Sequence, residues 1–130
     1  DAKGAWSLNP FDRGKSIEAT LKGWGTNFPV IDKFDKTSRT ITSIKSLDLN
    51  AKSYQSGNAV FNRVKGYIDK LAGFQRGELQ EIIIESGDFD NRVLELAIPE
   101  GATSSQLEQL KKLKEYAQEQ SIQLTIVLAK

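Results

Sequence analysis

The stretch IDKFDKTSRTITSIKSLDLNAKSY (residues 31–54) predicts two strands joined by a turn. Val, Ile and Phe are frequent over residues 28–34, and Ile and Thr are frequent over residues 40–49. These residue types are enriched in strands. The polar run 35–39 separates the two segments, so we expect it to form the turn of an antiparallel hairpin. The rest of the fold is predicted outward from this hairpin.

Polar side chains of the two strands are expected to share one side of the hairpin. Side chains alternate along a strand, so Ser43 and Lys45 point the same way, and the hairpin can bring Asp32 beside them. An acid among Val, Ile and Phe side chains needs a partner, because burying an unpaired charge is costly. A metal ion or a lysine would supply that partner. A cross-strand ion pair between Asp32 and Lys45 is therefore the purely structural alternative.

The remaining chain predicts an α/β fold, a mixed sheet flanked by helices. Residues 1–11 are expected to be a flexible segment, and residues 12–130 a single domain. The predicted order is helix, strand, strand, helix, strand, strand, helix, strand. Apolar spacing and capping residues place these elements as follows: helices at 12–22, 58–71 and 104–120, and strands at 28–34, 40–49, 81–85, 92–98 and 122–128.

The last third of the chain carries the plainest signals. Thr103 and Gln106 form a capping-box pattern at the start of the third helix. Its inner face is expected to carry the following apolar residues: Leu107, Leu110, Leu113 and Ala117. The run 122–128 is β-branched and nearly continuous, as in a strand buried on both faces. A strand, helix, strand order predicts that the two final strands are parallel.

Composition restricts the chemistry that this chain can perform. The 130 residues include no His, Cys or Met, which excludes nucleophiles activated by histidine and zinc sites made of His or Cys. Carboxylates and hydroxyls remain, and these oxygen ligands suit Mg²⁺ or Mn²⁺, with Zn²⁺ as an alternative. Lys and Arg number 18 against 17 Asp and Glu, so any basic patch must be local. No membrane-spanning segment is expected, and a start at Asp1 suggests a piece of a larger protein.

The segments NFPVIDKFD (27–35) and TSIKSLDLNAKSY (42–54) resemble the C-terminal toxin domains of CdiA-type contact-dependent growth inhibition proteins, in the PD-(D/E)xK nuclease superfamily. The ending LELAIPEGATSSQLEQLKKLKEYAQEQSIQLTIVL (94–128) is similar to the ending of those domains. The resemblance implies a restriction-endonuclease-like core. It also implies a catalytic set in which four positions meet at one metal: Glu18, Asp32, Ser43 and Lys45.

The roles of these four residues follow from the resemblance. Glu18 and Asp32 would hold the metal ion, which polarises the scissile phosphate and activates a water. Ser43 stands where the superfamily more often has Asp or Glu, and it would help to position the metal or its water. Lys45 would stabilise charge that develops on the phosphate oxygens or orient the attacking water. Asp35 is the alternative to Asp32, although alternation places it in the turn.

The resemblance further implies an endonuclease toxin that cleaves nucleic acid in competing bacterial cells. Transfer RNA is favoured slightly over DNA, because that activity is frequent among the relatives. A cognate immunity protein would neutralise the toxin in the producing cell. The domain would be part of a larger filament protein, exported on the cell surface or secreted, and would act in the cytoplasm of the target cell.

Substrate contacts are expected after the second strand, from Lys52, Tyr54 and Gln55. Trp24 and Tyr54 could stack on a base. A phosphate-binding rim could include further cations: Lys15, Lys22, Lys33, Lys52, Arg63 and Lys65. Two other functions remain open, namely a binding module that docks through the hairpin and the strand 81–85, and a hydrolase that acts on another substrate.

Overall fold

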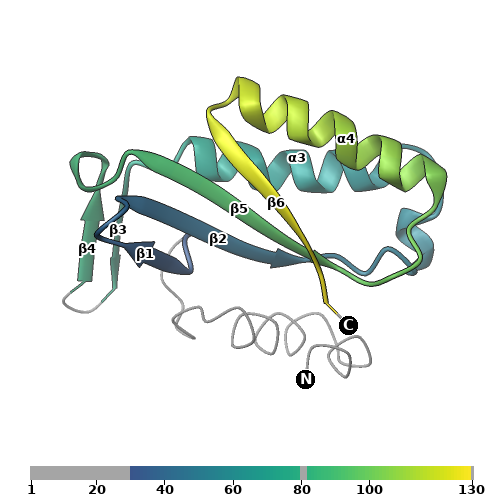
Figure 1. The fold of residues 1–130 in the computed structure, drawn as a ribbon, viewed down its shortest axis with the longest axis horizontal. Helices are drawn as coiled ribbons and strands as arrows, with labels where there is room; N and C mark the ends of the chain where they lie inside the picture. Colours follow the sequence, from purple (N-terminus) through teal and green to yellow (C-terminus); the bar gives the residue numbers. More distant parts are fainter. Residues whose placement is uncertain (1–29, 80–81, 130) are drawn as a thin grey trace.

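The protein is built around a four-stranded mixed sheet with the strand order β1-β2-β5-β6 (Figure 1). The computed structural model describes residues 30–79 and 82–129, so the helix expected at 12–22 and the segment 1–11 lie outside the described residues. Pairing is antiparallel between the first two strands and parallel between the others. The bounds of the strands are β1 (Lys33–Asp35), β2 (Thr40–Ser46), β5 (Asn91–Ile98) and β6 (Ile122–Leu128). The expected hairpin and the expected parallel pair are both confirmed. The strands of the hairpin are shorter than predicted, because β1 begins at Lys33 and β2 ends at Ser46, so Asp32 and residues 47–49 lie outside them.

Both helices of the described residues pack on the same face of this sheet (Figure 1). They are α3 (Ala59–Ala72) and α4 (Ser104–Glu119), and each lies within one residue of its predicted bounds. The predicted capping box is present, since Thr103 Oγ1 accepts from the Gln106 N–H and Gln106 Oε1 accepts from the Thr103 N–H. No helix of the described residues is long and apolar enough to span a membrane.

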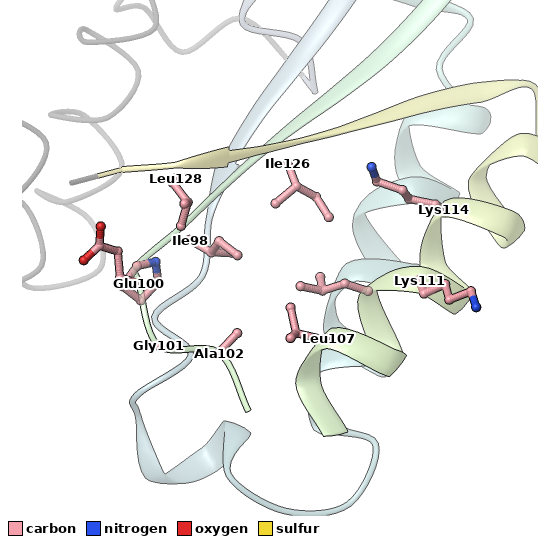
Figure 2. A pocket seen from close by; sticks show the side chains of 11 residues that line it. Ile98, Glu100, Gly101, Ala102, Leu107, Lys111, Lys114, Ile126 and Leu128 are labelled. Atoms are coloured by element: carbon pink, nitrogen blue, oxygen red, sulfur yellow. The ribbon is translucent and has the colours of Figure 1, made fainter. Parts of the chain in front are cut away.

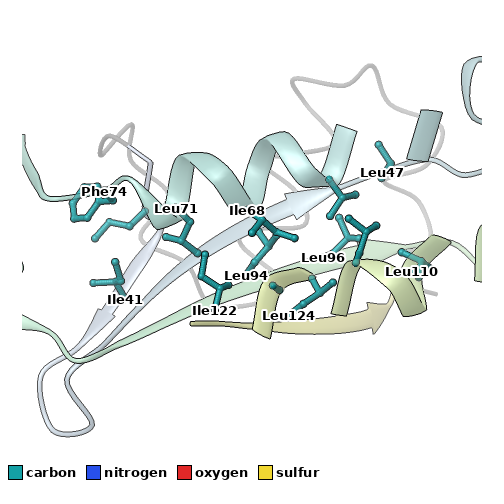
Figure 3. Close-up of a cluster of buried hydrophobic side chains, with 14 of the residues drawn as sticks. Ile41, Leu47, Ile68, Leu71, Phe74, Leu94, Leu96, Leu110, Ile122 and Leu124 are labelled. Carbon is teal, nitrogen blue, oxygen red and sulfur yellow. The ribbon is translucent and has the colours of Figure 1, made fainter. Parts of the chain in front are cut away.

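The hydrophobic core lies between the two helices and the sheet (Figure 3). Strand β5 contributes Leu94 and Leu96, which are fully buried because β5 has a neighbour strand on each side and helices above it. Helix α3 presents the apolar stripe expected from its spacing. The residues of that stripe are Val60, Val64, Ile68 and Leu71.

A second, two-stranded sheet was not predicted. Strand β3 (Arg76–Leu79) pairs antiparallel with β4 (Ile82–Glu85), and neither belongs to the main sheet. The sequence predicted a strand at 81–85, which corresponds to β4. Gly77 of β3 was interpreted only as a residue that ends the preceding helix. A four-residue strand that contains glycine has too weak a pattern to be recognised without its partner. A short 3₁₀ helix (Ser86–Asp88) occupies the predicted turn after β4.

Two expectations about burial were wrong. Leu107 was placed on the inner face of α4 but is 55% exposed, whereas Gln106 and Gln109 are buried. Strand β6 was expected to be buried on both faces, but it is a sheet edge among the described strands and Leu128 is 53% exposed. Edge position explains the exposure, because nothing in the described residues pairs with the outer side of β6.

The two buried glutamines hold the segment that follows β2. Gln106 Nε2 donates to the carbonyls of Leu49 and Tyr54, each at 2.8 Å. Gln109 Nε2 donates to the Gly57 carbonyl, and its Oε1 accepts from the Phe61 N–H at the start of α3. Side chains of α4 therefore satisfy backbone groups that the loop and the helix N-terminus leave unpaired.

Replacing the first of these glutamines tests that role. We expect Gln106→Ala to lower the free energy of unfolding by roughly 2–4 kcal/mol, because the part-buried Tyr54 carbonyl and the capping box lose a partner and the buried Leu49 carbonyl keeps only Gln55. Urea denaturation measures the change. Gln118→Ala, an exposed position on the same helix, is the matched control and should shift the midpoint little. Equal effects of the two changes would contradict this role of Gln106.

Candidate active site

Strand β2 carries two of the predicted site residues on the side that faces the helices. Its parallel register with β5 pairs Ser43 with Leu94 and Lys45 with Leu96. Because paired residues point to the same face of a sheet and both leucines are fully buried, Ser43 and Lys45 point toward the core side. Ser43 is only 2% exposed, whereas Lys45 near the end of β2 is partly buried. The predicted alternation is confirmed.

Asp32 reaches the same place from the segment before β1. Its N–H donates to the Thr42 carbonyl at 2.7 Å, and its Oδ2 accepts from the Ile44 N–H at 2.6 Å. The Ile44 N–H lies between Ser43 and Lys45 along β2. Strand β1 covers only the first part of β2, so the Asp32 carboxylate serves as acceptor where the β1 backbone does not. The structure thus places the Asp32 carboxylate on the backbone of β2 between Ser43 and Lys45.

The Lys45 ammonium group lies near the ring of Tyr67, a residue of α3. Nζ is 5.4 Å from the ring centroid, a cation–π distance. The ion pairs of the hairpin are instead Lys33 with Glu95, at 2.8 Å, and Arg39 with Asp90, at 2.7 Å. The alternative of an ion pair between Asp32 and Lys45 is not found among the described residues. Sequence reasoning missed Tyr67, because α3 was analysed only for its apolar stripe.

A complete metal site is not present among the described residues. Residues 30–79 and 82–129 hold no cluster of three acids that could bind a metal ion. Asp32 supplies one oxygen donor there, and Glu18, the second predicted ligand, lies outside the described residues. A carboxylate beside a serine hydroxyl is a donor set suited to a hard divalent cation. The metal ligands therefore stay a prediction.

Asp35 and the expected substrate residues have identifiable structural roles. Asp35 Oδ1 accepts from the Thr37 and Ser38 N–H groups, and these bonds hold the pKa of its carboxyl below the ordinary value. Asp35 is nevertheless the last residue of β1 and pairs with Thr40, so the expectation that it lies in the turn was wrong. Its carboxylate binds the backbone of the turn that follows. Gln55 donates to the Leu49 carbonyl and so stabilises its own loop. Lys52 is exposed, and Tyr54 lines a pocket of about 490 Å³ on α3 that has both polar and apolar walls.

The proposed cationic rim is only partly available. Lys33 is bound to Glu95, and Lys65 is bound to Asp69 at 2.9 Å. Tyr116 and then Lys65 lower the pKa of Asp69 by hydrogen bonding, and Asp69 in turn raises the pKa of Lys65. Lys15, Lys22 and Trp24 lie outside the described residues. Lys52 and Arg63 remain, since neither forms an ion pair within residues 30–79 and 82–129.

A larger pocket, of about 650 Å³, lies away from these residues between α4 and β6 (Figure 2). Leu107, Ile126 and Leu128 line it together with Lys111 and Lys114. Its surface is mainly apolar, and of the predicted catalytic residues that the structure describes, none lines it. The exposed leucines that the sequence assigned to the core thus form the wall of this pocket.

Known proteins resemble this chain over most of its length. The family described as "CDI toxin restriction endonuclease-like domain" matches residues 13–127. "Deoxyribonuclease CdiA-o11" of Escherichia coli O157:H7 (strain EC869) is 31% identical over 118 residues, which is 90% of this chain. "Deoxyribonuclease CdiA" of Yersinia pseudotuberculosis serotype O:3 (strain YPIII) is 29% identical over 105 residues, 80% of this chain. The chain spans 31% and 10% of the lengths of these two relatives.

A solved structure shows the same fold. The "CdiA-CT/CdiI toxin and immunity complex from Yersinia pseudotuberculosis" includes a chain that matches with a TM-score of 0.74 and 23% sequence identity. The match covers 90% of this chain and 98% of that chain. The expected mixed α/β fold of the restriction-endonuclease-like type is therefore confirmed.

Two substitutions at Asp32 separate its structural contact from its charge. Asp32→Ala removes the acceptor of the Ile44 N–H and is expected to lower the free energy of unfolding by about 1–3 kcal/mol. Asp32→Asn keeps an acceptor oxygen and is expected to lose less than half of that amount. Urea unfolding curves measure both variants. Equal losses in the two would show that the hydrogen bond to Ile44 is not the stabilising contact.

Proposed function

The chain belongs to the CDI toxin restriction endonuclease-like family, and on that premise we propose that it is a metal-dependent endonuclease that cleaves DNA. The observation that supports this most is the convergence of Asp32, Ser43 and Lys45 at one point of β2. Both relatives described above are named deoxyribonucleases. Their names favour the DNA alternative and give no support to the preference for transfer RNA.

Each residue of the site has a role that its surroundings suit. Asp32 would supply one carboxylate ligand and Glu18 the other, with Mg²⁺ or Mn²⁺ as the preferred ion and Zn²⁺ as the alternative. The ion would polarise the scissile phosphate. Ser43, on the core side of β2, would orient a ligand of that ion through its hydroxyl. Lys45, near the edge of the core, would place its ammonium against the phosphate oxygens.

The family also carries a proposal about partners. The solved relative is a complex of a toxin with an immunity protein, and we infer that a cognate immunity protein neutralises this chain as well. The two named relatives are much longer than this chain. The domain is accordingly proposed to be carried by a larger exported protein and to act inside the target cell.

Cleavage assays test the enzymatic proposal. The protein is incubated with plasmid DNA or total RNA in Mg²⁺, Mn²⁺, Zn²⁺ or EDTA. We expect cleavage of DNA with a divalent ion and none in EDTA, because the ion is required to polarise the phosphate. Asp32→Asn and Lys45→Ala are expected to reduce the rate by at least about 100-fold, the usual cost of losing one electrostatic contact to the transition state. Initial rates from gels give these numbers.

Lys112→Ala is the control. Lys112 is exposed on α4, and its replacement removes the same charge as Lys45→Ala. It should leave the rate unchanged. Degradation of RNA alone would overturn the choice of DNA. DNA cleavage that persists in EDTA, or in both folded site variants, would overturn the site. Intact substrates from folded protein free of inhibitor would favour the binding-module alternative.

A further inference from the structure

A groove of about 490 Å³ runs along one side of α3, next to the candidate active site. One helical face lines most of it, because residues spaced by three or four lie on the same side of a helix. The 3₁₀ helix Lys52–Tyr54 closes one end through Tyr54. The side chains used here, called the α3 groove, are Tyr54, Asn62, Arg63, Tyr67 and Lys70, with Gly66 between them.

The α3 groove adjoins Lys45 through a shared side chain. Tyr67 lines the groove, and its ring is the one that lies 5.4 Å from the Lys45 ammonium. The Tyr67 ring thus lies between the proposed catalytic lysine and the groove. If one phosphate of a nucleic-acid strand contacts Lys45, the next one or two phosphates of that strand would reach this groove.

The charge of the groove is positive. Arg63 and Lys70 line it, and no Asp or Glu of residues 30–79 and 82–129 does. Neither cation forms an ion pair within residues 30–79 and 82–129, in contrast to Lys65 on another side of the same helix, which binds Asp69. Such cations beside aromatic rings are typical of surfaces that track a nucleic-acid backbone.

The spacing of the two cations suits a phosphate backbone. Arg63 and Lys70 are seven residues apart, which is about 10 Å along a helix that rises 1.5 Å per residue. One strand of B-DNA carries a phosphate for about every 3.4 Å of axis. Because the strand also winds around the axis, neighbouring phosphates lie farther apart than this rise, so two long, flexible side chains at that separation can each contact a different phosphate of one strand.

Gly66 lies between these two cations and exposes the helix backbone. A Cβ added at Gly66 would meet no heavy atom within 4 Å, so no packing within the described residues requires glycine there. Glycine is the least favourable residue in a helix interior apart from proline. Its presence is explained when a ligand approaches the helix backbone closely.

We propose that the α3 groove binds the phosphodiester backbone of the DNA strand next to the scissile phosphate, through Arg63 and Lys70. This rests on the proposed nuclease function and adds the path of the substrate away from Lys45. Tyr54 and Asn62 provide a hydroxyl and an amide as neutral donors to the same backbone. Recognition of this kind is independent of base sequence.

Binding measured without cleavage tests the proposal. All variants are made in the Asp32→Asn protein, and the dissociation constant for a fluorescein-labelled 20-base-pair duplex is measured by anisotropy over a range of NaCl in EDTA. We expect the double variant Arg63→Gln/Lys70→Gln to bind about tenfold more weakly at 0.1 M salt. Its slope of log affinity against log salt should fall by about two, one for each lost phosphate contact.

A matched pair of cations outside the groove is the control. Lys36 in the β1–β2 turn and Lys112 on α4 are exposed and form no ion pair among the described residues. Lys36→Gln/Lys112→Gln removes the same net charge and should leave the slope unchanged. If both double variants change the slope equally, the effect is one of overall charge and the groove proposal is wrong.

Gly66→Ala gives an independent readout. Alanine should raise the thermal midpoint, because the helix gains propensity and the added methyl group has free space. It should nevertheless weaken DNA binding several-fold, because the methyl group occupies the place of the backbone ligand. A more stable variant that binds DNA as before would overturn the close approach proposed at Gly66.

These outcomes keep the groove and the nuclease function apart. The groove proposal alone would be overturned if the native protein cuts DNA while the Arg63→Gln/Lys70→Gln variant binds DNA with unchanged affinity and an unchanged salt slope. A protein that neither cuts nor binds DNA would overturn the function and with it the groove.

Discussion

The parallel pairing of β2 with β5 is the constraint on which the rest of the structure depends. It sets Ser43 opposite Leu94 and Lys45 opposite Leu96, so polar residues share a face with the most deeply buried side chains. A shift of this register by one residue would turn the polar pair away from the helices. The other edge of β2 pairs with the short strand β1 and, at Ile44, with the Asp32 carboxylate. Core packing and the geometry of the site are thus fixed by one set of backbone hydrogen bonds.

The helix α4 contributes to the site from a distance. Its buried glutamines bind the carbonyls of Leu49, Tyr54 and Gly57, which belong to the segment between β2 and α3. That segment positions the Tyr54 ring at the end of the α3 groove. Buried polar contacts of this kind favour one loop conformation, because any other would leave the amides without acceptors. The crossover helix between β5 and β6 therefore has a second role besides covering the sheet.

The sequence predicted the parts of the fold that local patterns determine. The bounds of α3, α4 and β6 and the capping box at Thr103 follow from periodicity and residue type. Partners that lie far apart in the chain could not be predicted in the same way. The burial of Gln106 depends on carbonyls that the loop supplies 52 and 57 residues earlier. Strand β3 is defined by β4, and the exposure of β6 follows from the order of strands.

In the site, too, local features were predicted from the sequence and contacts between distant segments were not. Alternation was sufficient to predict that Ser43 and Lys45 share a face, and the hairpin that Asp32 lies beside β2, because each step is local or involves neighbouring strands. The contact between Lys45 and Tyr67 joins β2 to a helix and required the tertiary structure. A signal for that helical face was nevertheless available. Arg63, Gly66 and Lys70 recur at three- and four-residue spacing, on a side of α3 away from its buried apolar stripe. An exposed glycine between two cations is a pattern that hydrophobic periodicity does not detect.

Charge distribution completes the argument about function. The chain has a formal net charge of +1, so attraction to DNA cannot come from the molecule as a whole. In the part of the chain that the structure describes, four cations are bound in ion pairs with acids, and these are Lys33, Arg39, Lys65 and Arg76. Such pairs cancel much of the local field. Arg63 and Lys70 lie in a groove that no acid of the described residues lines, so none of these acids cancels their charge within it. A nearly neutral protein can in this way present a positive surface beside its proposed catalytic lysine.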